Sequence, residues 1–367
     1  MRIKSRNGKR FTTSLLKWDC EQNTREMPWK GEKDPYKIWL SEVILQQTRV
    51  EQGWSYYKKF TERFPDIISL ARASDERIYK MWEGLGYYSR CSNLIHTARL
   101  IAFEHKGKFP EKYDDILKLK GVGPYTAAAI SSFAFNQPYA VVDGNVYRVL
   151  SRYFGIDKSV DTAEGKTFFS DLALQLLDKK NPGRYNQALM DFGAVVCKPV
   201  SPACVLCPLA GGCVAFKKKS TSEFPVKSKT TRKKTRWLYY IVAEYRGKYL
   251  VRKRDKKDIW RNLHEFLLVE SNKAIDKASV FKMAVRGGLI KPQGYKYISQ
   301  SALYTQQLSH QKITGRIFYI SYYLPPLIPE GFKMVSVEGM KKRAFPRLLK
   351  IYLENVPVGK KRRLPQE

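Results

Sequence analysis

Cysteine is scarce in this sequence, and long apolar runs are missing from it. Six cysteines in 367 residues are too few for a secreted disulfide framework, which is usually a short chain with many regularly spaced pairs. No apolar run approaches the ~20 residues needed to cross a bilayer. The basic N-terminal stretch MRIKSRNGKRF lacks the apolar segment of a signal peptide. We therefore expect a protein of the reducing cytoplasm that does not enter a membrane.

Acidic residues are also scarce. The sequence holds 34 Asp and Glu against 67 Lys and Arg, a formal net charge of +33. This excess favours a polyanionic partner, because a basic protein that binds nucleic acid releases condensed counterions. A generally basic proteome or a membrane-surface role would also produce a basic chain. The missing apolar run argues against the membrane.

The length allows two or three domains, and no internal repeat of fixed period is visible. Apolar residues recur at spacings of three and four in the first part of the chain, as in WLSEVIL, so we predict a mostly α-helical domain over residues 1–216. Residues 237–367 begin with two β-rich runs around an Arg-Gly pair, which is a hairpin signal. We predict an α+β domain there.

A basic stretch, KKKSTSEFPVKSKTTRKKTR, separates the two predicted domains at residues 217–236. It holds nine basic residues against Glu223 alone and has little to bury. Such a run is typical of an exposed linker. The linker is either a solvated tether or a segment that contacts phosphates.

Four of the six cysteines lie close together, in the pattern C-x6-C-x2-C-x5-C. They are Cys197, Cys204, Cys207 and Cys213. The two-residue gap between Cys204 and Cys207 puts two thiolates on one short turn, as zinc ribbons and iron-sulfur clusters both require. A reducing compartment favours metal over disulfides, but the spacing alone leaves zinc and a 4Fe-4S cluster open.

A glycine-rich turn joins two predicted helices in LKGVGPYTAAAI. Gly121, Val122 and Gly123 could expose consecutive backbone N–H groups at a helix N-terminus, where they would hold a phosphate. Many helix pairs simply join through glycine, so the turn alone is weak evidence of function.

Two carboxylates stand in suggestive contexts. Asp143 in AVVDGNVYRVLSR comes just before a predicted helix, where an Asp is most often an N-cap. Glu42 in WLSEVILQQTRV is flanked by apolar residues and is a candidate for a carboxyl of raised pKa. The position alone favours the other interpretation, that Glu42 is a charge on a helix surface.

The order of helix, glycine hairpin, helix, Asp143 and four-cysteine loop resembles the helix-hairpin-helix DNA glycosylases related to endonuclease III. In that resemblance the four cysteines hold one 4Fe-4S cluster. Bifunctional members carry a lysine after the hairpin glycines, whose amine forms a Schiff base and cuts the strand. Here that residue is Tyr125, which implies base removal by water and little strand cleavage unless another lysine takes that role.

Trp29 in MPWK, Glu42 and the GLGYYSR segment at residues 84–90 extend the likeness. Together with the hairpin and the cysteines they resemble the MutY-type adenine DNA glycosylases. The resemblance implies excision of adenine mispaired with 8-oxoguanine, or with guanine, in double-stranded DNA. It implies a protein associated with the nucleoid, which we expect to act as a monomer.

The resemblance also assigns roles in the reaction. Glu42 is the general acid that protonates adenine N7, and Asp143 stabilises the oxocarbenium ion. Tyr125 and Asn145 orient Asp143 and the sugar, and Gln187 faces the flipped adenine. The remaining substrate-binding residues implied in the first domain are Trp29, Leu45 and Gln47.

Further residues are implied in DNA binding. An enzyme that acts on a base must evict it from the stack, and Gln47 with Tyr87, beside Leu85, match the family's wedge. Gly121, Val122 and Gly123 would hold the DNA backbone, with a monovalent cation as a further possible partner. The iron-sulfur loop offers only Lys198 as a basic residue.

The second half resembles the Nudix-like domain that recognises 8-oxoguanine in this family. The segment KKDIWRNLHEF lacks the glycines of the family pattern, and the sequence has no Nudix hydrolase box, so pyrophosphatase activity is not expected. Family members usually carry Phe-Ser-His in the lesion-reading loop, where this chain has Leu308, Ser309 and His310. The lost Phe weakens a stacking contact, whereas Ser309 can still hydrogen-bond the lesion.

Two other functions compete with this interpretation. An endonuclease III-like pyrimidine glycosylase and lyase is disfavoured by Tyr125 and Glu42. A metal-bearing DNA-binding protein without catalysis would explain the charge and the cysteines, but it leaves the contexts of Glu42 and Asp143 unexplained.

Overall fold

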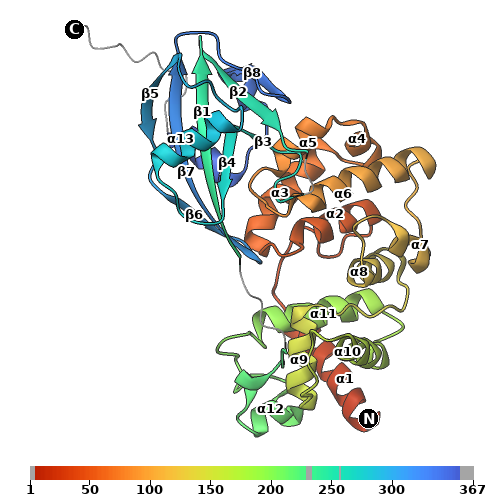
Figure 1. Cartoon of the computed structure of the whole chain (residues 1–367). Helices are drawn as coiled ribbons and strands as arrows, with labels where there is room; N and C mark the ends of the chain where they lie inside the picture. Colours follow the sequence, from red (N-terminus) through yellow and green to blue (C-terminus); the bar gives the residue numbers. More distant parts are fainter. Residues whose placement is uncertain (1–4, 229–233, 256–257, 356–367) are drawn as a thin grey trace. The chain divides into compact units, whose positions relative to one another are not determined.

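The computed structural model describes residues 5–228, 234–255 and 258–355. The chain divides into two compact units (Figure 1). The first comprises residues 1–72 and 93–230, and the second comprises residues 73–92 and 231–367. This grouping differs from the predicted domain ranges because the segment 73–92 belongs with the second unit. Residues 229–233 of the predicted linker lie outside the described residues, so the linker stays a prediction.

The first unit is built of helices. Their bounds are α1 Ser5–Glu21, α2 Pro35–Leu45, α3 Val50–Arg63, α4 Ile67–Arg72, α6 Tyr88–Arg99 (which begins in the second unit), α7 Tyr113–Lys118, α8 Pro124–Phe135, α9 Gly144–Phe154, α10 Ala163–Leu176, α11 Pro182–Val195 and α12 Val214–Lys217. A π-helical turn, Leu100–Glu104, extends α6, and short 3-10 turns cover Ala210–Gly212 and Thr221–Glu223. The prediction of a helical first domain is confirmed.

Local sequence signals set the ends of the helices that carry the site. Asp34 caps α2 by accepting the backbone N–H of Tyr36 at 2.9 Å, and Pro35 occupies the first helical position. Gly155, with φ +66°, ends α9 in the left-handed conformation that glycine adopts without steric cost. These caps fix where α2 and α9 begin and end.

The core of the first unit lies among α1, α8, α9, α10 and α11. It is rich in aromatic rings, with Phe11, Phe169, Tyr185 and Phe192 all buried. The backbone of α11 closely approaches α9, since a Cβ placed on Gly193 would lie 2.6 Å from Cβ of Asn145. Glycine at this position therefore lets the start of α9 lie directly on α11.

The second unit contains a mixed β-sheet. Its strands are β1 Lys234–Tyr245, β2 Lys248–Lys253, β3 His264–Glu265, β4 Leu267–Ser271, β5 Tyr295–Gln300, β6 Tyr304–Gln307, β7 Gln311–Tyr322 and β8 Phe332–Ser336. Its helices are α5 Asp75–Trp82, α13 Lys277–Arg286, α14 Val337–Lys341 and α15 Arg347–Asn355. Strand β1 pairs in parallel with β7, and the other described pairings are antiparallel. The predicted α+β character is confirmed.

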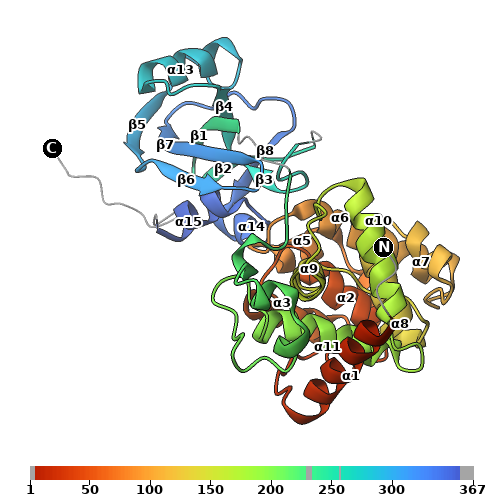
Figure 2. The ribbon, with the colours of Figure 1, turned by 90° about the horizontal axis from the view of Figure 1, so that it is seen from below.

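Strands β1 and β2 form the predicted hairpin. Arg246 and Gly247 both have positive φ, +49° and +74°, as a two-residue type I′ turn requires. Residues 238–243 of β1 are buried throughout, because helices cover both sheet faces. Figure 2 shows α13 on one face and α15 on the other. A strand covered on both faces reads as a continuous apolar run, which explains LYYIVA.

None of the helices within the described ranges is long and apolar enough to span a membrane.

Candidate active site

A cavity of about 420 Å³ opens in the first unit. It lies where α2, α8, α9 and α11 meet the segment that precedes α2. The predicted residues that line it are Trp29, Glu42, Leu45, Tyr125, Asp143, Asn145 and Gln187. The fold thus brings together candidates that are spread over more than half of the first unit's sequence.

Glu42 lies in the last turn of α2 with only 7% of its surface exposed. Burial raises the pKa of its carboxyl to about 7, against an ordinary value of 4.5. A hydrogen bond from Tyr125 partly opposes the rise, and the nearby charge of Asp143 adds to it. Glu42 is therefore not a helix-surface charge, and near neutral pH a large fraction of it carries a proton.

Tyr125 lies in the first turn of α8, directly after the glycine hairpin. Its hydroxyl hydrogen-bonds the Glu42 carboxyl and lies 3.7 Å from Sδ of Met190. Burial, followed by the charges of Glu42 and Asp143, raises the pKa of the phenol well above its usual value. Tyr125 is thus a neutral donor that joins α8 to the candidate acid.

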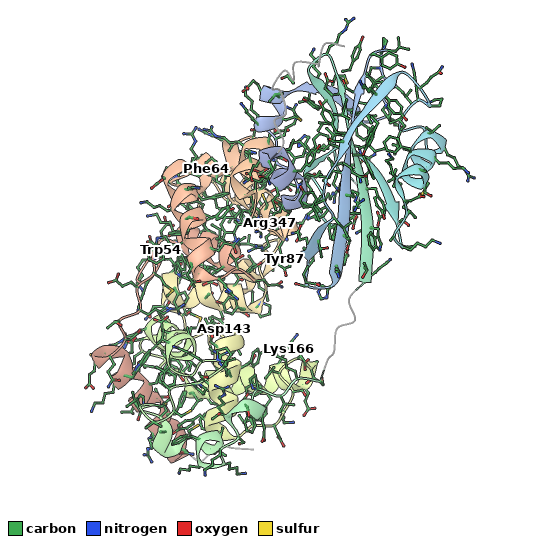
Figure 3. The ribbon with its side chains drawn as sticks, turned by 90° about the vertical axis from the view of Figure 1, so that its left-hand side faces the viewer. Trp54, Phe64, Tyr87, Asp143, Lys166 and Arg347 are labelled. Atoms are coloured by element: carbon green, nitrogen blue, oxygen red, sulfur yellow. The ribbon has the colours of Figure 1, made fainter. Side chains whose placement is uncertain are left out.

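Asp143, labelled in Figure 3, is the N-cap of α9. Its Oδ1 accepts the backbone N–H of Val146 at 2.8 Å, and its Oδ2 accepts Nδ2 of Asn145 at 2.7 Å. Burial raises the pKa of Asp143, while these bonds and the charge of Arg148 oppose the rise. The N-cap interpretation is therefore confirmed, and the cap fixes the carboxylate at the edge of the cavity. The role of Asp143 in the reaction stays a prediction.

Arg148 was not singled out from the sequence, yet it orders the start of α9. Its Nη2 donates to Oδ1 of Asn145 at 2.8 Å and to the carbonyl of Gly193 at 2.7 Å. Its Nε donates to the carbonyl of Cys197 at 2.8 Å. Because Arg148 occupies the oxygen of Asn145, the amide nitrogen of Asn145 must face Asp143.

A charged cluster behind Gln187 was also missed. Gln187 Nε2 donates to Oδ1 of Asp191 at 2.9 Å, and Asp191 also binds Arg25 at 2.8 Å and Lys30 at 3.0 Å. Arg25 and Lys30 line the cavity. The sequence offered one signal, since Gln187 and Asp191 are four residues apart and lie on one helix face. The two cations come from a distant loop, which no local pattern could connect to them.

The glycine hairpin joins α7 to α8 as predicted. Gly121 has φ +82°, and a Cβ there would lie 2.7 Å from Cβ of Asn93. Both the backbone conformation and the lack of space therefore require glycine at this position. Val122 is buried, and Gly123 is the extended N-cap of α8. The helix-hairpin-helix prediction is confirmed, whereas phosphate and cation binding here remain predictions.

The three wedge candidates fall in different units. Gln47 follows α2 in the first unit, and Tyr87 belongs to the second; both are non-glycine residues with positive φ, +55° and +47°. Such conformations are uncommon and often accompany function. Tyr87 is 42% exposed and Arg90 lies over its ring at 5.5 Å, whereas Leu85 is buried.

Leu308, Ser309 and His310 lie in the connection between β6 and β7, within the second unit. The hydroxyl of Ser309 is hydrogen-bonded to that of Tyr87. The backbone N–H of Lys234 donates to the carbonyl of His310 at 3.1 Å. The structure thus joins two predicted DNA-contacting residues, Tyr87 and Ser309, that are 222 positions apart.

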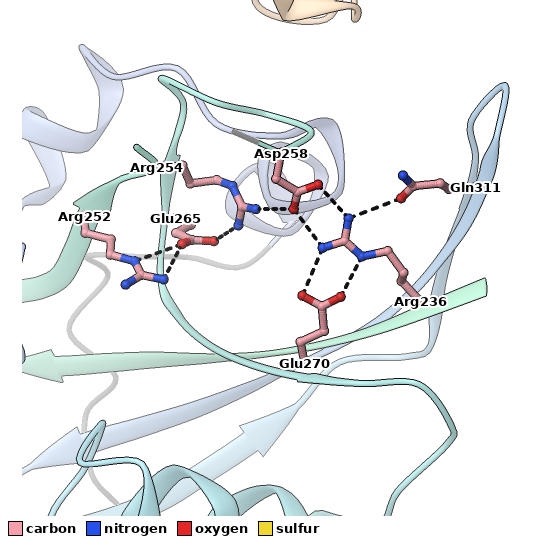
Figure 4. A network of polar contacts seen from close by, with 7 residues as sticks. All are labelled: Arg236, Arg252, Arg254, Asp258, Glu265, Glu270 and Gln311. Atoms are coloured by element: carbon pink, nitrogen blue, oxygen red, sulfur yellow. Dashed lines mark hydrogen bonds and ion pairs between the residues drawn. The ribbon is translucent and has the colours of Figure 1, made fainter. Parts of the chain in front are cut away.

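An ion-pair network supports the base of this connection (Figure 4). Arg236 on β1 binds Asp258 at 2.8 Å and Glu270 at 2.6 Å, and it donates to Gln311 at 3.2 Å. Arg254 bridges Asp258 and Glu265, and Arg252 also binds Glu265. The network fixes the first residue of β7, directly after His310.

The four cysteines gather in the loop that follows α11. Arg152 Nη1 lies 3.5 Å from Sγ of Cys197, and Sγ of Cys213 lies 3.4 Å from the carbonyl of Arg152. Burial and then the neighbouring thiols raise the pKa of Cys207 to about 11. Within the part of the chain that the structure describes, no three His, Cys, Asp or Glu side chains are arranged to bind one metal ion.

Known proteins share this fold. A family model described as HhH-GPD superfamily base excision DNA repair protein matches residues 40–170. The solved structure of a thermostable thymine-DNA glycosylase is 29% identical, with a TM-score of 0.54, and the match covers 58% of this chain and 98% of that one. The fold and the site therefore define a base excision DNA glycosylase of the helix-hairpin-helix class.

Sequence relatives narrow the class. The adenine DNA glycosylase of Buchnera aphidicola subsp. Schizaphis graminum (strain Sg) is 37% identical over 256 residues, which cover 70% of this chain and 74% of that protein. The Homo sapiens adenine DNA glycosylase is 41% identical over 214 residues, covering 56% of this chain and 39% of the human protein. The chain belongs to the adenine DNA glycosylase family, and the resemblance predicted from its motifs is confirmed.

Proposed function

We propose that this enzyme is a monofunctional glycosylase that removes adenine mispaired with 8-oxoguanine, or with guanine, from double-stranded DNA. The observation that carries the proposal is the pairing of Glu42, a buried carboxyl of raised pKa, with Asp143 at one cavity. Two carboxyl groups held in different environments can divide the acid and the stabilising roles.

Glu42 supplies the proton. Adenine is a poor leaving group until a ring nitrogen is protonated, so the reaction needs an acid that keeps its proton near pH 7. A pKa of about 7 balances the protonated fraction against readiness to transfer the proton. Tyr125, which binds the Glu42 carboxyl, orients it toward the cavity.

Asp143 stabilises the sugar as the bond to adenine breaks. The departing base leaves oxocarbenium character on the sugar, and a fixed carboxylate lowers the energy of that charge or traps it covalently, as in glycoside hydrolysis. The cap bond to Val146 and the bond from Asn145 hold both oxygens of Asp143 without reorganisation during the reaction. Tyr125 has no amine to form a Schiff base, so water completes the reaction and the strand stays intact.

The basic chain binds DNA and evicts the base. Its net charge of +33 supports phosphate binding. Gly121, Val122 and Gly123 hold the backbone, with a monovalent cation as an additional ligand. Gln47 and Tyr87 fill the space left by the flipped adenine, and their strained backbone supports this role. The adenine enters the cavity between Trp29, Leu45 and Gln187.

The cysteine loop holds one 4Fe-4S cluster. The residue types suit the group, because four thiols share one short loop and the guanidinium of Arg152 donates toward Cys197, which would stabilise a thiolate. Binding would have to draw the sulfurs together, since no three of them surround one ion position in the described structure. When bound, the cluster ties the loop together and performs no chemistry on the base.

The second unit is a Nudix-like lesion-reading domain. Ser309 hydrogen-bonds 8-oxoguanine, and Leu308 and His310 flank it. Because Ser309 already contacts Tyr87, the loop that reads the lesion and the wedge are coupled within this unit.

Single-turnover excision tests the proposal. The enzyme is assayed on duplexes with A opposite 8-oxoguanine, A opposite G, or thymine glycol, and strands are cleaved with alkali afterwards. Excision of adenine, without strand cleavage before alkali and without a borohydride-trapped adduct, supports the proposal. Processing of the thymine glycol duplex alone would favour an endonuclease III-like pyrimidine glycosylase and sink the adenine assignment.

A further inference from the structure

A fully buried carboxylate lies behind the wall of the active-site cavity. The Asp191 side chain has 0% of its surface exposed. Four donors surround it, which we call the Asp191 cluster: Arg25 at 2.8 Å and Gln187 at 2.9 Å on Oδ1, and Lys30 at 3.0 Å and Asn23 at 3.1 Å on Oδ2. Each oxygen thus receives one cation and one amide.

The cluster dictates which way round the Gln187 amide lies. A carboxylate is only an acceptor, so the end of an amide that faces it must be the nitrogen. Arg25 and Lys30 hold Asp191 in place, and Gln187 lies one turn away on the same helix, α11. The amide therefore cannot reverse without placing its oxygen against a buried carboxylate oxygen, an unpaired contact that is costly away from water.

We propose that Asp191 is a positioning residue that fixes the Gln187 carbonyl oxygen toward the bound base and so selects purines with an amino group at C6. This inference rests on the proposed function and concerns which purines the same cavity takes. Adenine presents an N6 amino group, which donates to a carbonyl oxygen. Hypoxanthine presents O6 at the same place, and two oxygens facing each other leave both unpaired.

The Asp191→Asn variant isolates this effect. Asparagine has one oxygen and one NH₂ group. When its NH₂ faces Gln187, the Gln187 amide turns over and presents its nitrogen to the cavity, where it suits hypoxanthine and opposes adenine. In that orientation the NH₂ also faces Arg25, which is a donor. When the asparagine oxygen faces Gln187 instead, the NH₂ faces Lys30 and Asn23, which are donors as well. The variant thus loses the unique amide orientation.

The experiment compares single-turnover excision of adenine, unsubstituted purine and hypoxanthine, each opposite 8-oxoguanine. We expect the wild type to excise adenine faster than hypoxanthine. We expect Asp191→Asn to lower the adenine-to-hypoxanthine rate ratio by about ten-fold or more, since discrimination built on a hydrogen bond is lost with that bond. Purine, which has no group at C6, should lose least rate, because it neither gains nor loses a contact.

Asp19→Asn is the matched control. Asp19 also lines the cavity and accepts from the same Asn23 at 2.9 Å, but its other partner is Arg184 at 3.0 Å. Among the described residues, none of its hydrogen bonds goes to Gln187. We expect this control to keep the wild-type ratio of adenine to hypoxanthine excision, even if the excision rates on both bases change together.

A reciprocal exchange provides the rescue. In Gln187→Glu with Asp191→Asn, residue 187 carries only acceptors, residue 191 can donate to it, and the charge of the cluster is unchanged. We expect the double variant to regain the wild-type ratio, even if Asp191→Asn alone folds poorly. Equal losses for both bases in Asp191→Asn, or a double variant without discrimination, would overturn the proposal.

The wild-type enzyme alone also tests the inference, through its relative excision of adenine and hypoxanthine. Equal excision of adenine and hypoxanthine would overturn the inference while leaving the glycosylase activity intact. If the wild type excised neither adenine nor hypoxanthine, and so did not differ from the Glu42→Gln variant, the proposed function itself would be contradicted.

Discussion

Replacing Glu42 with glutamine should stabilise the protein while abolishing excision. Burial raises the pKa of Glu42 from 4.5 to about 7, and this interval corresponds to about 3 kcal/mol. Because the folded-state pKa is raised, the folded protein binds this proton more tightly than the unfolded chain. Its stability is therefore unaffected below pH 4.5, falls as pH rises toward 7, and carries the full cost above that.

Glutamine is neutral at every pH and can still accept the bond from Tyr125. We expect the free energy of unfolding of Glu42→Gln to exceed that of the wild type by about 3 kcal/mol at pH 8, and by less than about 1 kcal/mol at pH 5. Urea unfolding followed by circular dichroism at both pH values measures the difference. An equal gain in stability at both pH values, or a loss at pH 8, would refute the conclusion that burial raises the pKa of the Glu42 carboxyl.

The same variant should keep its affinity for the lesion duplex. The proton is needed mainly in the transition state. General acid catalysis contributes ~10²–10⁴-fold to a rate, so the excision rate of the variant should fall by about 10²-fold or more. Single-turnover rates and gel-shift binding, measured on one preparation, separate the two effects. Comparable excision by the variant would place the acid elsewhere.

Three further predictions concern pH, the hairpin and the ion-pair network. In the wild type, excision should fall as the pH rises above about 7, because Glu42 loses its proton; a rate that rises from pH 7 to 9 would contradict its role as the acid. Excision should also fall at acidic pH, because the buried Asp143 carboxyl must stay ionised to stabilise the sugar. Gly121→Ala should cost about 1–3 kcal/mol of stability because of its positive φ and its close neighbour, whereas Gly123→Ala, whose Cβ meets open space, is the control in thermal melts; equal costs would contradict the argument. Arg236→Met should destabilise by roughly 1–2 kcal/mol, and because Arg236 lowers the pKa of Asp258, the difference in urea unfolding should narrow as pH falls below about 4; a constant difference would exclude that charge interaction.

Features that depend on residues close together in the chain could mostly be predicted from the sequence. The apolar residues around Glu42 indicated burial, and the position of Asp143 indicated a helix cap, because both signals lie within one helical turn. The Arg-Gly pair at 246–247 predicted its hairpin for the same reason. The roles of these residues in the reaction came from the family resemblance and stay predictions.

Long-range features could not be read in this way. Arg25 and Lys30 precede Asp191 by about 160 positions, and only the packing of the loop before α2 against α11 brings them together. The segment 73–92 groups with the C-terminal unit, although its own helical pattern is like that of its neighbours in the chain. Neither relation leaves a trace in local spacing, because each depends on which surfaces meet after folding.

The N-cap bond of Asp143 makes the reaction depend on an intact first turn of α9. The carboxylate proposed to stabilise the sugar is also the group that starts α9, through the N–H of Val146. A substitution that frays the first turn of α9 would therefore release Asp143 without changing any side chain in the cavity. Variants of this enzyme that lose activity while keeping every predicted site residue are expected to cluster in that turn.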